Sequence, residues 1–245
     1  MKQITIFILI VVSILATGCA GDQLPDNRVT IIGSGNMVSQ EAALADFDRL
    51  EVGFAFDVTV RQGEAYKVSA SVDDNLANYL YLANEVGTLQ IGLKPGFAYD
   101  IPAATMRAEV VMPRLVGVTM TGSSHATLID LDAAPDFAAD LSGSSALEGS
   151  LKSGVATFTL SGSTLARLSG ATERVTIDIC GNSMIDLRSF QVKDAAVDAS
   201  CNSTVLLNLD GKLTADASQY AQVTYRGHPD LNGVETVESA SVRPE

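Results

Sequence analysis

The sequence predicts an all-β protein built as a single-stranded β-helix, or β-solenoid, with turns of about 20 residues. Three observations predict this fold. A short phrase recurs at a nearly fixed period in the second half of the chain, apolar and polar residues alternate on both sides of it, and each copy is centred on Gly and Ser. We expect three short faces in each turn and one short helix near the N-terminal end.

Each copy of the phrase can be aligned on a small hydroxyl or thiol residue at its centre. The residues one before, five after and seven after this anchor are apolar in almost every copy. A unit of this size cannot bury its apolar face alone, so we expect the copies to stack with like positions about 4.8 Å apart. Gly supplies the unusual φ of the corner, and the hydroxyls are expected to satisfy its amides. The anchors are Thr121, Ser142, Ser161, Cys180, Ser200 and Ser218, at steps of 21, 19, 19, 20 and 18 residues.

The chain ahead of the repeats reads as short strands, with one segment of helical spacing at 73–84. Asp73 or Asp74 can cap this helix at its N-terminus. We therefore assign residues 29–230 to the solenoid domain and 231–245 to a polar C-terminal tail. The residues expected on one face of the helix are Leu76, Tyr79, Leu80 and Ala83.

The N-terminus combines a basic start, an apolar run of about a dozen residues and the small residues ATGC. This pattern predicts a signal peptide at 1–19 with a lipobox, lipidation of Cys19, and a tether at 20–28. An ordinary secreted protein and an uncleaved anchor are the alternatives. Ala20, rather than Asp, follows the cysteine, and by analogy with Gram-negative sorting this favours the outer membrane.

The formal charge of −13, from 29 acidic and 16 basic residues, argues against some partners. Nucleic acid and anionic lipid headgroups both require basic patches, so we expect contact with a membrane only through the lipid anchor. Trp is absent and aromatic residues make up 6% of the chain, which leaves few candidates for a stacking site.

Four aspartates occupy the position two residues before the anchor. Because this position alternates with buried ones, these side chains should point outward and form a face for a cation or a partner. Stacked carboxylates could attract Ca²⁺, while a solvated face that keeps the solenoid soluble is the simpler interpretation. A catalytic role is the weakest, since the column lacks basic residues. The four are Asp140, Asp178, Asp198 and Asp216.

Cys180 stands at an anchor and Cys201 one position beyond the next anchor, so the two are one turn apart and out of register by one residue. A disulfide and two free thiols both remain open. Zinc is not expected, because there is no CxxC motif and no nearby histidine. Ser123 and Ser124 precede His125, but the GxSxG pattern is absent, and we interpret these hydroxyls as corner residues.

Several phrases together resemble the DUF2807 family, described as auto-transporter adhesins with a head GIN domain. They are GSGN at 33–36, FDRLEVGFAFDVTVRQG at 47–63, DDNL at 73–76, GTLQIGLKPG at 87–96 and the later SGSS-like repeats. The resemblance implies a β-helical, often lipid-anchored envelope protein and supplies no catalytic residues. The family usually has Ser-Gly-x before its Phe-Asp-Val, whereas this chain has Gly53-Phe54-Ala55, so the first corner should differ in shape.

We therefore expect a lipid-anchored cell-envelope solenoid that acts as a non-enzymatic, adhesin-like binding module. Its partner would be an envelope protein or a glycan, and it would need no cofactor. A carbohydrate-active β-helix enzyme, of the polysaccharide lyase or hydrolase type, is the alternative by analogy of fold.

Overall fold

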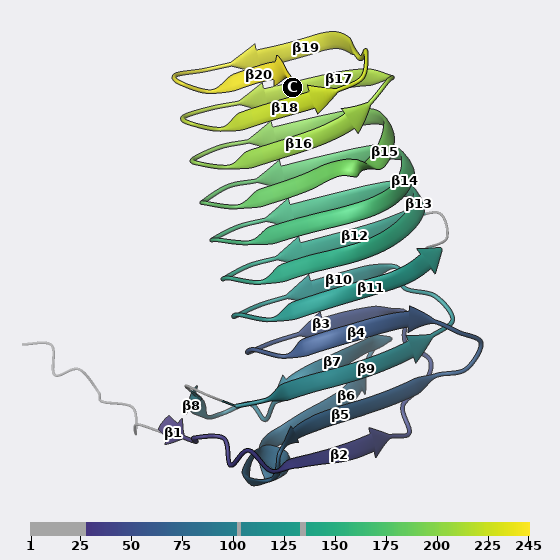
Figure 1. Ribbon diagram of the computed structural model, residues 1–245, viewed down its shortest axis with the longest axis vertical. Helices are drawn as coiled ribbons and strands as arrows, with labels where there is room; N and C mark the ends of the chain where they lie inside the picture. The colour runs from purple at the N-terminus through teal and green to yellow at the C-terminus, as the bar shows by residue number, and fades with distance from the viewer. Residues whose placement is uncertain (1–27, 102–103, 133–135) are drawn as a thin grey trace, which may run out of the picture.

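The computed structural model describes residues 28–101, 104–132 and 136–245 (Figure 1). The predicted signal peptide, its lipidated Cys19 and the tether up to residue 27 lie outside these residues. Within the described ranges, no helix is both long and apolar enough to cross a membrane.

The predicted β-solenoid is confirmed. Figure 1 shows the turns stacked along the long axis, with narrow corners on one side and curved strands on the other. Strands that lead into a corner form one sheet, here the entry sheet, and strands that leave a corner form the exit sheet. The strands of the regular stack are β10 (Gly117–Met120), β11 (His125–Asp132), β12 (Asp136–Leu141), β13 (Ala146–Leu160), β14 (Leu165–Ile179), β15 (Met184–Ala199), β16 (Thr204–Leu209), β17 (Lys212–Ala217) and β18 (Gln222–Arg226).

Successive turns pair in parallel, and the apolar columns expected from the repeat are in register. Phe158 of β13 pairs with Ile177 of β14, which pairs in turn with Val197 of β15, and all three are buried. Parallel strands that alternate buried and exposed residues place every second side chain in the interior. The core is therefore one continuous stack that runs the length of the solenoid.

In three turns of the described stack, the third short side is a bend within a strand. β13, β14 and β15 pass from the exit sheet to the entry sheet without a break, and their bent middles remain paired. Gly149 and Gly170 begin two of these bends with φ of 130° and 127°, where a Cβ would collide with the carbonyl of the turn beneath.

The N-terminal end is not a simple continuation of the stack. On the exit sheet, β2 and β9 both pair antiparallel with β5, and on the entry sheet β6 pairs antiparallel with β7. Strands β7 and β9 lie beneath β3 and β4, while β10 and β11 lie above them, so chain order and spatial order differ. The strands of this end are β1 (Arg28–Thr30), β2 (Met37–Ala42), β3 (Arg49–Val52), β4 (Asp57–Gln62), β5 (Lys67–Asp73), β6 (Leu80–Glu85), β7 (Thr88–Leu93), β8 (Ala98–Asp100) and β9 (Met106–Met112).

The helix predicted at 73–84 is present only in part. A 3₁₀ helix, η1 (Asp74–Tyr79), is followed directly by β6. Asp73 stands at its N-cap position but makes no capping bond; its buried carboxylate accepts hydrogen bonds from the Gly35 and Thr105 amides at 3.0 and 2.9 Å. The second half of the predicted helix forms β6 instead, because the edge of β7 offers it unpaired backbone groups.

The assignment of 231–245 to a tail is wrong. Asp230–Thr236 forms β19, which pairs with β17, and Ser241–Pro244 forms β20, which pairs with β18. This segment is a further turn whose Val234 and Val242 pack against the core. The segment is polar although it is folded, because the last turn of a stack is covered on one side only.

Candidate binding surfaces

The aspartate column lies on the outer face of the entry sheet. Thr119, Asp140, Thr159, Asp178, Asp198, Asp216 and Glu235 pair in register from turn to turn, and all seven are exposed. Four consecutive carboxylates thus project from one flat face, from Asp178 to Glu235. The described residues contain no group of three or more His, Cys, Asp or Glu side chains able to hold a metal, so Ca²⁺ has no structural support here.

A column of small residues lies beside the acidic one, two residues earlier in each strand. Its members include Ala138, Thr157 and Thr176, all exposed. At the N-terminal end of this face, a hollow of about 400 Å³ lies over Gly117 and Ala138, with Arg49 at its edge. The carboxylates of the acidic column therefore stand beside a row of small side chains on the entry sheet.

The corners carry much of the Ser and Thr of the repeat. In each, the backbone amides donate to carbonyls of the corner beneath, as from Ser144 to Gly122 O at 2.7 Å. Two of the buried hydroxyls donate to carbonyls: Ser124 Oγ to Thr121 O at 2.9 Å and Ser145 Oγ to Ser142 O at 3.0 Å. The expectation that these hydroxyls satisfy amides holds at one corner, where the Thr164 amide donates to Ser183 Oγ at 3.4 Å; other corner amides donate to carbonyls of the turn beneath.

The His125 side chain faces two carboxylates and not a serine hydroxyl. Its Nδ1 lies 3.1 Å from Asp57 Oδ1 and its Nε2 lies 3.6 Å from Glu148 Oε2, both on the exit sheet. The neighbouring Ser124 is buried with its hydroxyl bonded to main-chain oxygens. The two side chains that a serine–histidine pair would use therefore have other partners.

An ion-pair network continues from this histidine along the exit sheet. Glu148 pairs with Arg167 at 3.1 Å, and Arg167 lies 3.8 Å from Asp186. Asp186 is buried and accepts two bonds from Arg188, at 2.9 and 2.7 Å. Those hydrogen bonds lower the pKa of Asp186 below its usual 3.8, against the opposing effect of burial.

This network was not predicted from the sequence. Its charges alternate in sign between turns, so no single repeat shows the pattern. Glu148, Arg167 and Asp186 pair in one register column. All three stand at the sixth position after their anchors, and the alternating charges at this position are the sequence signal of the network.

The two cysteines are free and partly exposed. Cys201 adopts the left-handed conformation with φ of 62°, at the corner position that Gly181 fills in the turn beneath. The Ser200 hydroxyl lies 3.8 Å from the Cys201 thiol.

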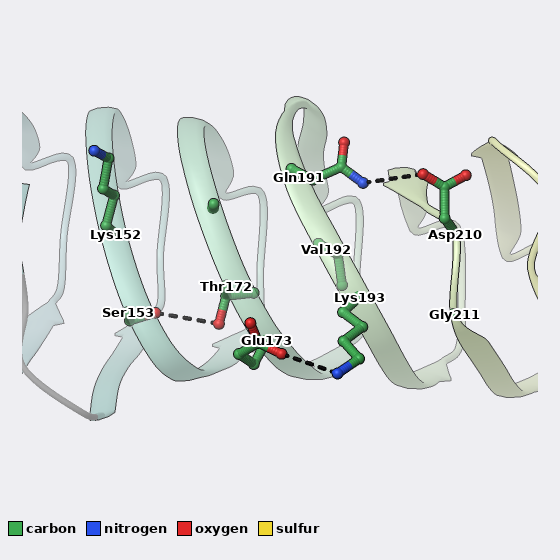
Figure 2. Close-up of a pocket in the computed structure, with 10 residues that line it drawn as sticks. Lys152, Ser153, Thr172, Glu173, Gln191, Val192, Lys193, Asp210 and Gly211 are labelled. Atoms are coloured by element: carbon green, nitrogen blue, oxygen red, sulfur yellow. Dashed lines mark hydrogen bonds and ion pairs between the residues drawn. The ribbon is translucent and has the colours of Figure 1, made fainter.

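A groove of about 490 Å³ follows the bends of four neighbouring turns (Figure 2). Its charged and amide groups bond to one another: Lys193 lies 3.2 Å from Glu173, and Gln191 donates to Asp210 at 3.4 Å. Ala171 and Val192 contribute apolar groups to the lining. These internal bonds would have to exchange for a ligand to enter, so the groove is a weaker candidate than the open face of the entry sheet.

Fold and surfaces together define a β-solenoid with an acidic column on the outer face of its entry sheet. The chain belongs to the DUF2807 family, whose model, described as "Putative auto-transporter adhesin, head GIN domain", matches residues 46–229. The resemblance stated from the sequence is confirmed. None of the curated proteins matches the chain.

Solved structures show the same fold. A protein from Bacteroides fragilis titled "putative adhesin" is similar with a TM-score of 0.81 at 13% identity, over 88% of this chain and 100% of its own. From Parabacteroides distasonis, a "putative adhesin" matches with a TM-score of 0.66 at 16% identity, and a "putative lipid binding protein" with 0.62 at 19% identity. Each of the latter two alignments covers 89% of this chain and 100% of the other. At these identities the likeness concerns the fold alone.

Proposed function

We propose that this protein is a non-enzymatic, adhesin-like module of the bacterial cell envelope, exported and held to the membrane by a lipid on Cys19. The family's adhesin description and the lipobox-like ATGC sequence support the proposal. A rigid stack of turns suits this role because each turn contacts only its neighbours and presents the same outer positions repeatedly.

The acidic column of the entry sheet is the observation that carries the binding role. Asp178, Asp198, Asp216 and Glu235 project from consecutive turns beside a column of small residues. A flat, regularly charged face of this kind complements a partner that carries basic groups at a similar spacing. An envelope protein with an exposed basic strand or loop is the partner class that fits it.

The binding role is tested by capture of envelope components with the full-length protein. The variant Asp178→Asn/Asp198→Asn/Asp216→Asn should lose the captured protein, and the loss should be reproduced in the wild type by raising salt. The matched control, Glu41→Gln/Glu64→Gln/Glu109→Gln, removes the same charge from exposed positions at the N-terminal end. Equal capture by both triple variants would contradict the assignment to this face.

The lipid anchor is tested separately. Cys19→Ala should move the protein from the membrane fraction to the soluble fraction of the envelope, because no lipid can then attach at that position. Cys180→Ala serves as the control for loss of a thiol. A Cys19→Ala protein that remains in the membrane fraction would overturn this part of the proposal.

A further inference from the structure

A pocket of about 400 Å³ opens on the entry sheet at the N-terminal end of the solenoid. Its floor contains Gly53 and Gly92, from strands that are neighbours: the Gly53 amide donates to Ile91 O at 3.0 Å. Because neither residue has a side chain, the outer surface drops between Tyr81 below and Thr121 above, both of which line the pocket.

Phe54 forms the wall on the corner side. A Cβ on Gly92 would lie 3.4 Å from Cδ2 of this ring, so the ring stands directly against the floor. Tyr99 contacts the ring edge-on with centroids 5.4 Å apart, and Tyr99 is itself packed against Tyr79 and Phe97. Phe54 remains 39% exposed, so its position is fixed while part of its surface is available to a ligand.

The backbone of Phe54 is strained. Its φ is 63°, in the left-handed region that bulky residues rarely adopt. The same corner position holds glycine in the four turns above: Gly122, Gly143, Gly162 and Gly181. A strained aromatic residue where glycine would fit without strain points to a role for the ring, because such strain concentrates at binding sites.

The polar groups of the pocket are mostly acceptors. Gln90 donates to Glu51 at 3.1 Å, and the Tyr81 hydroxyl donates to Glu85 at 2.7 Å. That bond to Glu85 raises the pKa of Tyr81, so the phenol stays protonated. One oxygen of each carboxylate and the Gln90 carbonyl oxygen accept no side-chain bond from these partners, and no Lys, Arg or His is among the lining residues.

We propose that this pocket binds a neutral sugar residue of a glycan, with its C–H face against the Phe54 ring and its hydroxyls donating to Glu51, Glu85 and Gln90. An anionic ligand would meet two carboxylates and no cation. The acceptors come from three strands, Glu51 from β3, Gln90 from β7 and Glu85 from β6, which suits a ring with several hydroxyl donors better than a single cationic centre. The volume is also in the usual range for small-ligand sites. This inference rests on the proposed binding function and gives it a ligand class at a site separate from the acidic column.

The test is calorimetric titration of the full-length protein with neutral gluco-, manno-, galacto- and chito-oligosaccharides, with oligogalacturonate and choline as charged probes. At least one neutral oligosaccharide should bind, and the charged probes should not. Phe54→Gly should weaken that binding about tenfold or more, as loss of an aromatic anchor does. Gly53→Val should do the same by filling the floor, since a Cβ there meets only Thr121 Oγ1 at 3.5 Å. Tyr220→Ala, which removes a ring exposed at a distant corner, should bind as wild type.

Three results would overturn the inference: binding of none of the neutral sugars, stronger binding of choline or oligogalacturonate, or unchanged affinity in both pocket variants. Melting curves of each variant separate loss of the site from loss of the fold. The acidic-column triple variant should retain sugar binding. Partner capture that depends on the acidic column, without any sugar binding, would overturn this inference and leave the proposed function standing. Sugar binding without such capture would support this inference and overturn only the assignment of partner binding to the acidic column.

Discussion

Two sets of corners on the same side of the solenoid adopt one backbone conformation with different residues. In the middle of the stack, the left-handed position is glycine at four consecutive turns, and an added Cβ would press on the carbonyl of the corner beneath. At the two ends, the position is filled by side chains: Phe54 at the N-terminal end, and Cys201, Gln219 and Glu238 at the C-terminal end, all with φ near 60°. The corner therefore imposes the left-handed conformation whichever residue fills it. A residue other than glycine at this position marks a turn that carries the strain of a Cβ in that conformation.

The largest expected effect is at the N-terminal end, where the antiparallel strands depend on one buried carboxylate. Asp73→Ala leaves the Gly35 and Thr105 amides without their acceptor and should lower the free energy of unfolding by about 2–4 kcal/mol. Chemical denaturation measures this, with Asp74→Ala as the control. A loss no larger than that of the control would show that the two amides find other acceptors.

The glycines of the central corners are expected to tolerate almost no larger side chain. Gly162→Ala adds a Cβ 2.6 Å from the Gly143 carbonyl oxygen at φ of 86°, and should cost about 2–3 kcal/mol in unfolding free energy. Thermal unfolding of this variant beside Gly53→Ala, whose added Cβ has room, makes the comparison direct. Equal melting temperatures would refute the close stacking of the corners.

The exit-sheet network gives a pH-dependent prediction. The folded-state pKa of Asp186 is depressed by the Arg188 hydrogen bonds, so its contribution is present above the unfolded value near 3.8 and is lost as pH falls through the folded value. Asp186→Asn should therefore cost about 1–2 kcal/mol at pH 7 and progressively less below pH 4. Stability measured against pH checks this, and a difference that is constant down to pH 2 would contradict it.

At the C-terminal end, removal of a side chain should stabilise. Cys201→Gly relieves the left-handed strain of a residue with a Cβ and loses part of that gain to unfolded-state entropy, for a net of about 0.5–1 kcal/mol. The melting temperature, measured with reductant present, should rise. A lower melting temperature would mean that the contacts of the Cys201 side chain stabilise the fold by more than its left-handed backbone conformation destabilises it.

The smallest effect concerns the acidic column. Like charges directly opposite on neighbouring strands repel, so the triple Asn variant of Asp178, Asp198 and Asp216 should gain a few tenths of a kcal/mol at low salt and nothing at high salt. Denaturation at two ionic strengths distinguishes this from a structural role. A destabilised triple variant would point to a bound cation.

Much of the regular stack could be predicted from the sequence because one period governs it. The columns of Phe158, Ile177 and Val197 are in the expected register, since alternation and corner spacing leave no other pairing. At the N-terminal end the period fails: β6 was predicted as helix because its apolar spacing suits both structures, and only the edge of β7 decides between them. The pocket at Phe54 could not be predicted for the same reason, as Gly53 and Gly92 meet only when β7 inserts beneath β3.

The measurement that tests this account most directly is a paired determination of stability and sugar affinity in Phe54→Gly. If the corner imposes the conformation and the ring serves a ligand, glycine should hold the melting temperature near that of wild type, because relief of strain offsets the lost contact with Tyr99. Affinity for the neutral oligosaccharide should fall about tenfold or more. A variant that melts far lower yet binds the sugar as tightly as wild type would contradict the account, since Phe54 would then be a packing residue only.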